Sequence, residues 1–287
     1  MTMLDGHIHI AEGSQDRADF TRRVQEAGVE GGVIISLAPA SFRAGRPTPS
    51  AEERLDNLFF WSDAGPAFHP FYWIDPLEDN AIEQVALAVD RGVMGFKVIC
   101  DRFHPGDPRA LEVFKAVAVT RRPILFHCGI LWDGKPSSAY NRPGGFEELL
   151  RVEGLRFALA HLGWPWCDEL LAVYGKFLNA YAARPDLSVE MFIDTTPGTP
   201  PIYRRDALAK LFTIGYDVEN NVIFGSDCNT GAYNADWVKE WRTRDSRILD
   251  ELQVSAEVRE KVFGRNLERF LGVSAARVER KLPRPGQ

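Results

Sequence analysis

The chain has 287 residues, of which 45% are hydrophobic and 26% are charged, and its formal net charge is −6. This is the composition of a globular protein, and its acidic balance argues against a nucleic acid or an anionic membrane as a partner. No apolar run approaches the roughly 18 residues of a membrane-spanning helix. The four cysteines lack C-x-x-C spacing and the N-terminus does not read as a signal peptide, so we expect free thiols and a cytoplasmic location.

Eight short apolar runs recur along the chain, and their starts lie 26 to 36 residues apart. They begin at Leu4, Gly31, Ala67, Val93, Pro123, Phe157, Leu187 and Val222. Amphipathic stretches of helical length separate them, and "DRADFTRRVQEAG" and "NAIEQVALAVDRG" each end in Gly, a common helix stop. Eight β/α units predict a single-domain α/β fold, the (β/α)8 TIM barrel, with a doubly wound open sheet as the alternative. We expect the barrel over residues 1–274 and a basic, Pro-rich tail over 275–287.

Polar residues stand at the carboxyl ends of several predicted strands, which is the end of such a barrel that carries its chemistry. The chain has six histidines, and four of them lie there, together with one aspartate. These five residues are His7 and His9 in "LDGHIHI", His127 in "LFHCG", His161 in "LAHLG" and Asp227 in "FGSDC". Each follows an apolar run, where an unpaired polar group would be costly to bury.

Imidazole and carboxylate groups on one rim predict a metal site. Residues i and i+2 of a strand point to the same side, so His7 and His9 should face one way. The donor types suit Zn²⁺, or a neighbour such as Mn²⁺, Fe²⁺ or Co²⁺, and the sequence does not choose among them. The alternative is a set of separate core histidines, each bonded to backbone, with one aspartate capping a helix. Asp5 shares the face of the two histidines, and we expect it either to hold a ligand's ring N–H or the Lys97 ammonium, or only to cap the strand.

With these motifs in order on successive strands, the sequence resembles the amidohydrolase superfamily, in the branch that contains aminocarboxymuconate-semialdehyde decarboxylase. The resemblance runs from His7 to about Leu271 and rests on "DGHIHI", "GFKVI", "FHCG", "AHLG", "FGSD" and "VFGRNLERFLG". It implies one divalent metal held by His7, His9, His127 and Asp227. It also implies that Asp227 moves a proton of the attacking water, and that His161 orients that water or stabilises an oxyanion.

Lys97, in "GFKVI", is open to three interpretations. In binuclear relatives a fourth-strand lysine is carbamylated and bridges two metals, whereas in the resembled branch a lysine occurs in this motif beside one metal. We favour an ammonium that binds a substrate carboxylate or phosphate. The third interpretation is a lysine whose stem packs in the barrel and whose head reaches solvent.

The loops after the later strands carry aromatic and cationic residues that suit a small aromatic or unsaturated acid. The candidate substrate-binding residues are Lys97, Trp132, Arg142, Trp164 and Tyr203. The leading functional hypothesis is a metal-dependent hydrolase that acts on a C–N or C–O bond of an amide, lactone or cyclic imide. The alternatives are a metal-dependent, non-oxidative decarboxylase and a barrel that binds a ligand without catalysis. The partner is expected to be a small molecule, and a homodimer is left open.

Overall fold

The computed structural model describes the chain apart from residues 1–2, 14–15, 43–44, 46, 66 and 274–287. The predicted tail over 275–287 therefore lies outside the described residues, as does residue 274, the expected end of the barrel domain. Within the described residues, no helix is both long and apolar enough to cross a bilayer.

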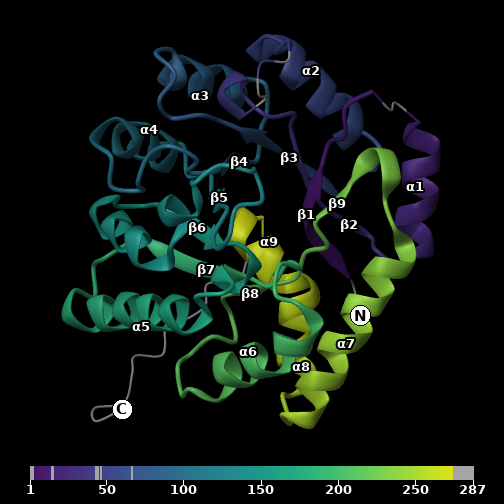
Figure 1. The fold of residues 1–287 in the computed structure, drawn as a ribbon, viewed down its shortest axis with the longest axis vertical. Helices are drawn as coiled ribbons and strands as arrows, with labels where there is room; N and C mark the ends of the chain where they lie inside the picture. The colour runs from purple at the N-terminus through teal and green to yellow at the C-terminus, as the bar shows by residue number, and fades with distance from the viewer. Residues whose placement is uncertain (1–2, 14–15, 43–44, 46, 66, 274–287) are drawn as a thin grey trace.

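In the part of the chain that the structure describes, nine strands form one parallel sheet in the order β8-β7-β6-β5-β4-β3-β2-β1-β9 (Figure 1). The strands are β1 (Leu4–His9), β2 (Gly31–Ile35), β3 (Phe68–Trp73), β4 (Gly95–Val98), β5 (Ile124–Phe126), β6 (Arg156–Leu159), β7 (Glu190–Asp194), β8 (Val222–Ile223) and β9 (Cys228–Asn229). Each predicted start from Leu4 to Val222 lies within three residues of the observed one, and the largest difference is at β7.

The short strands β8 and β9 belong to one run of chain that closes the sheet into a barrel. β8 pairs with β7, and β9 pairs with β1. Between them, the Gly6 N–H donates to the Phe224 carbonyl at 2.9 Å, and the Asp227 N–H donates to the His7 carbonyl at 3.0 Å. The eighth predicted strand therefore touches both the seventh and the first. The predicted barrel is confirmed, and the open-sheet alternative is wrong.

Helices cover the outside of the barrel (Figure 1). They are α1 (Arg17–Glu26), α2 (Ala51–Ser62), α3 (Ala81–Asp90), α4 (Pro108–Val119), α5 (Cys167–Ala183), α6 (Pro201–Thr213), α7 (Ala235–Glu251), α8 (Ala256–Glu260) and α9 (Asn266–Leu271). Local sequence sets several of their ends. Ser50 and Glu53 form a capping box at the start of α2, and Asp107 caps α4, whose first residue is a proline. Gly28 and Gly92, each just past a helix end, adopt positive φ.

The last helix closes the amino-terminal end of the barrel. Leu267, Phe270 and Leu271 of α9 join the apolar cluster that inward-facing strand residues form inside the barrel. The Phe270 ring lies 6.2 Å from the ring of Phe71 on β3 and 5.1 Å from that of Phe192 on β7. Figure 1 shows α9 behind the ring of strands. A substrate must therefore enter from the opposite end, where the carboxyl ends of the strands lie.

Candidate metal centre

The two histidines of β1 point to the same place, as strand alternation predicts. Their Nε2 atoms lie 3.1 Å apart. The His7 side chain is completely buried, whereas that of His9 keeps 26% of its surface exposed. His7 therefore forms the inner part of the site, and His9 forms the part next to the opening.

Asp227 joins these two imidazoles from the turn between β8 and β9. Its Oδ1 atom lies 3.7 Å from Nε2 of His7 and 3.5 Å from Nε2 of His9. Asp227 has a φ of +59°, and Gly225, two residues before it, has no room for a side chain, because a Cβ there would lie 2.7 Å from the Cβ of His7. Although burial opposes ionisation, the hydrogen bond from His9 and the neighbouring imidazoles hold the pKa of the Asp227 carboxyl well below its usual range.

His161 begins the short turn His161–Gly163 after β6 and forms a group with the buried His7 and with Asp227, whose side chain is 39% exposed. One ligand atom from each of these three residues lies within 4.8 Å of the others. His161 and Leu162 both have positive φ, +60° and +52°, which is uncommon for residues other than glycine. The imidazole Nδ1 of His161 donates to the Pro197 carbonyl at 3.2 Å. This bond leaves Nε2 of a neutral imidazole as the free acceptor.

His127, at the end of β5, lies beside His161 but is oriented differently. Their ring centroids are 4.8 Å apart. Its Nε2 lies 3.1 Å from the carbonyl oxygen of Ile130, a partner in its own loop. When Nε2 donates to that carbonyl, Nδ1 is the nitrogen with a free lone pair. The group of three ligand atoms that lie within 4.8 Å of one another contains His161 and not His127, so the ligand role expected of His127 stays a prediction.

Asp194, the last residue of β7, is absent from the predicted site and contacts its innermost imidazole. Its Oδ2 accepts from Nδ1 of His7 at 2.9 Å, and its Oδ1 accepts from the Thr196 N–H at 2.7 Å. Burial lowers the pKa of His7 well below its usual value, so its imidazole is neutral. Because Nδ1 donates to a carboxylate, the lone pair of His7 lies on Nε2, facing His9 and Asp227. The sequence signal was available, since Asp194 ends an apolar run as Asp227 does.

Lys97 lies inside the barrel on β4 and reaches the same group. Its side chain is almost fully buried, and its Nζ lies 3.3 Å from Nε2 of His7. Burial lowers the pKa of the ammonium to about 8. The interpretation in which its head reaches solvent is therefore wrong. As an ammonium, Lys97 could pair with a substrate carboxylate or phosphate, whereas carbamylation would require its neutral amine, whose share burial increases. Both interpretations stay predictions.

Asp5 contacts neither a ring nitrogen nor Lys97, so the supporting role predicted for it is wrong. Its Oδ1 accepts from the backbone N–H groups of His7 and Ser226 at 3.1 and 2.9 Å, and its Oδ2 accepts from the Tyr233 hydroxyl at 2.9 Å. Burial raises the pKa of its carboxyl to about 6. Asp5 therefore joins β1 to the eighth strand run, which is the strand-capping alternative in a stronger form.

The structure does not bring the predicted substrate-binding residues of the loops to the imidazoles as one wall. Trp132 is 81% exposed, and Arg142 is paired with Glu169 at 2.7 Å. Trp164 and Tyr203, with ring centroids 6.3 Å apart, line a groove of about 480 Å³ between α5 and α6 whose described lining contains no imidazole. The aromatic residue next to the site is instead Trp73 at the end of β3, whose ring centroid lies 5.9 Å from that of His9.

The arrangement of donor atoms fits a bound cation. The lone pair of His7 Nε2 faces the Nε2 of His9 and the carboxylate of Asp227. Without a metal, the Lys97 ammonium and the His9 imidazole supply the protons between these groups, and a divalent cation would take the place of those protons. Imidazole nitrogen and carboxylate oxygen are also the donors that Zn²⁺ and its transition-metal neighbours accept. The protein is thus a closed α/β barrel with a cation-binding set of side chains at its open, carboxyl-terminal end. This combination defines a candidate metal-dependent barrel enzyme.

Comparison with known proteins agrees with this class. The amidohydrolase family model matches residues 5–273, so the chain belongs to the amidohydrolase family. A comparison with curated protein sequences finds no significant match.

Solved structures share the fold at low sequence identity. A 2,6-dihydroxybenzoate decarboxylase from Rhizobium has a TM-score of 0.63 at 16% identity, over 95% of this chain and 99% of that one. A probable 2-pyrone-4,6-dicarboxylic acid hydrolase from Acinetobacter baumannii has a TM-score of 0.58 at 11% identity, over 95% and 100%. A dihydroorotase from Campylobacter jejuni has a TM-score of 0.57 at 15% identity, over 95% and 84%. These similar structures include hydrolases and a decarboxylase, so the fold does not select the reaction.

Proposed function

We propose that this protein is a metal-dependent hydrolase that cleaves a C–N or C–O bond in an amide, lactone or cyclic imide of a small carboxylated substrate. The observation that carries the proposal is the approach of Asp227 Oδ1 to Nε2 of both His7 and His9, within 3.7 Å, with a buried Lys97 ammonium alongside. This combination offers a cation-binding set, a proton acceptor and a carboxylate-binding group in one place.

His7, His9, His127 and Asp227 would hold one divalent metal, and Zn²⁺ is the proposed ion, with Mn²⁺, Fe²⁺ and Co²⁺ as alternatives. When bound, such an ion polarises a carbonyl oxygen and makes water acidic near neutral pH. The second carboxylate oxygen of Asp227 accepts the proton of the water and passes it to the leaving group. Asp227 suits this task because it is ionised at neutral pH.

His161 and Lys97 act on the substrate in this proposal. The Nδ1–H of His161 is bonded to the Pro197 carbonyl, so its Nε2 lone pair is fixed toward the reacting atoms and orients water there. In its protonated form this nitrogen instead stabilises a developing oxyanion. The Lys97 ammonium pairs with the substrate carboxylate, an interaction that its burial strengthens.

Non-oxidative decarboxylation is the second candidate, and one observation favours it. Trp73 is nearly buried beside His9, and the Phe42 ring packs 4.9 Å from it, which gives the site an aromatic wall. Such a wall suits a flat aromatic or unsaturated acid.

We also propose a cytoplasmic location, which is supported by the four cysteines being free thiols in the structure.

The test is a reaction screen with two isotopic readouts. The Zn²⁺-loaded protein is incubated with lactones, amides, cyclic imides and aromatic acids in H₂¹⁸O, and both ¹⁸O in the product and released CO₂ are measured. Incorporation of ¹⁸O without CO₂ supports the hydrolase, and CO₂ without ¹⁸O in the organic product supports the decarboxylase. Turnover should fall at least 100-fold in Asp227→Asn. Failure of the protein to bind any divalent metal would overturn both candidates.

A further inference from the structure

A buried ion pair joins α6 to α7 outside the barrel. Nε and Nη2 of Arg204 donate to the two carboxylate oxygens of Asp245 at 2.8 and 2.6 Å. The Arg204 side chain is completely buried and that of Asp245 is 4% exposed. The guanidinium also lies over the Trp241 ring, at 5.1 Å from its centroid. Burying two charges is expensive, and such a pair is often no more stabilising than apolar residues of the same size. Its presence therefore calls for an explanation other than stability.

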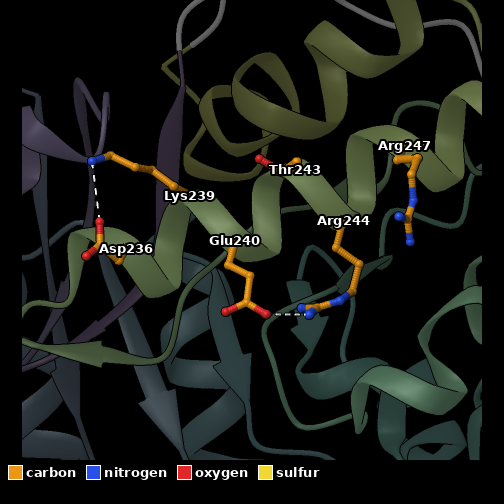
Figure 2. A pocket seen from close by; sticks show the side chains of 6 residues that line it. All are labelled: Asp236, Lys239, Glu240, Thr243, Arg244 and Arg247. Carbon is orange, nitrogen blue, oxygen red and sulfur yellow. Dashed lines mark hydrogen bonds and ion pairs between the residues drawn. The ribbon is translucent and has the colours of Figure 1, made fainter.

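The outer face of α7 offers a contrast. Figure 2 shows its charged side chains, where Lys239 pairs with Asp236 at 3.6 Å and Arg244 pairs with Glu240 at 2.5 Å. These pairs follow helical spacing and belong to one helix, although the Arg244 guanidinium also packs over the Trp241 ring, 4.5 Å from its centroid. Asp245 instead faces inward and pairs with another helix.

Arg204 has a third contact, and this one leads to the metal centre. Its Nη2 donates to the Thr195 carbonyl at 2.6 Å. Thr195 directly follows Asp194, the carboxylate that holds Nδ1 of His7. The Thr195 N–H also donates to the Ile223 carbonyl at 2.8 Å. The backbone beside Asp194 is thus fixed from both the barrel and the helix layer.

The loop that Arg204 anchors, residues 195–199, also holds the second imidazole. The Pro197 carbonyl accepts from Nδ1 of His161 at 3.2 Å, and the Thr199 hydroxyl lies 3.5 Å from the His161 carbonyl. A Cβ at Gly198 would lie 2.7 Å from the Cβ of His161, so the loop packs directly against this residue. A small shift of the loop would therefore move the acceptors of both imidazoles.

We propose that Arg204, held by Asp245, is a positioning residue that fixes loop 195–199 and thereby orients the imidazoles of His7 and His161. The inference rests on the proposed function, because the orientation of these two rings matters only if they act at the proposed metal site. Arg204 touches no reacting atom. It acts through the Thr195 carbonyl on Asp194 and Pro197, the acceptors of the two Nδ1–H groups.

The experiment removes both charges together, because leaving one buried charge unpaired would strongly destabilise the protein. Arg204→Met/Asp245→Leu keeps side-chain volume in the helix interface and loses the bond to Thr195. The matched control is Arg205→Gln, since Arg205 pairs with Glu251 at 3.0 Å across the same two helices but is exposed. Circular dichroism and thermal melting establish that each variant is folded. If the double variant does not fold, Arg204→Lys, which retains a charge for Asp245, takes its place.

Two readouts follow the imidazoles directly. In histidine-¹⁵N-labelled protein, the Nδ1–H protons of His7 and His161 should exchange with water at least 10-fold faster in the double variant than in wild type or Arg205→Gln. The Co²⁺ dissociation constant should rise about 10-fold in the double variant alone, the lower end of what loss of a ligand's support costs. Unchanged proton exchange in a folded double variant would overturn the inference, and so would an equal change in the control. The exchange measurement needs neither substrate nor metal. It therefore tests the role of Arg204 even if the proposed function is wrong.

Discussion

The Nδ1–H of His7 donates to Oδ2 of Asp194 at 2.9 Å, so the innermost imidazole presents its Nε2 lone pair to the centre of the site. Support of this kind fixes the tautomer of a metal-binding histidine and raises its basicity. Asp194→Asn replaces the accepting carboxylate with a neutral amide. We expect the Zn²⁺ dissociation constant to rise 10- to 100-fold, as measured by competition with a chromophoric chelator. Asp168→Asn, which alters an exposed carboxylate on α5, is the control, and equal affinity in the two variants would contradict the assignment.

Replacing His161 and His127 by alanine should have different effects on metal content. The resemblance makes His127 a ligand and His161 the residue beside the reacting water. His161→Ala is therefore expected to retain one equivalent of zinc by elemental analysis while losing at least 100-fold in kcat. His127→Ala is expected to lose both metal and activity. One ligand atom of His161 lies within 4.8 Å of ligand atoms of His7 and Asp227. Equal metal loss in the two variants would therefore identify His161 as a ligand.

Asp5→Asn should weaken the fold and spare the metal site. Both oxygens of Asp5 accept hydrogen bonds, two from backbone N–H groups and one from Tyr233. An amide has one acceptor oxygen and places N–H groups where a carboxylate oxygen was. We expect the free energy of unfolding in urea to fall by about 1–3 kcal/mol, with the zinc dissociation constant within about twofold of wild type. In Tyr233→Phe, which removes only one of the three bonds, the fall should be about 1 kcal/mol. Lower zinc affinity at unchanged stability would restore the original expectation for Asp5.

Removal of the metal should lower thermal stability without unfolding the protein. The barrel core is complete without an ion, because its strands and α9 bury their own apolar side chains. Zinc at 100 times its dissociation constant adds about 2.7 kcal/mol, which corresponds to a rise in Tm of about 5–10 °C over the chelated protein. Differential scanning calorimetry with and without a chelator measures this rise.

Elemental analysis should give one metal per chain, whereas two would indicate a bridging, carbamylated Lys97.

The strands could be predicted from sequence because each is a short apolar run followed by an amphipathic stretch with a clear stop. The division of the eighth run into the two short strands β8 and β9 could not be predicted from the sequence. Phe224 and Asp227 bond to β1 through backbone atoms, and backbone partners leave no trace in side-chain pattern. The same holds for α9, whose apolar residues at Leu267 and Phe270 read as an ordinary amphipathic helix rather than as the closure of the barrel.

The clustered histidines could be predicted because strand alternation and rim position depend only on where apolar runs end. The orientation of loop side chains depends on partners far along the chain. Arg142 pairs with Glu169, and nothing in the spacing of these two residues indicates that bond. Asp194 has the same local pattern as Asp227, a carboxylate after a buried strand, and could have been included on that ground.

The position of α9 at the base of the barrel has a consequence for biosynthesis. Until residues 266–271 have left the ribosome, the amino-terminal mouth of the barrel lacks Leu267, Phe270 and Leu271. The first strand also has one unpaired edge until Cys228 and Asn229 arrive to bond with it. For most of its synthesis, then, the nascent chain carries an open strand edge and an uncovered apolar interior, the two features that favour misassociation. The barrel can therefore close only after residues 266–271 have been made.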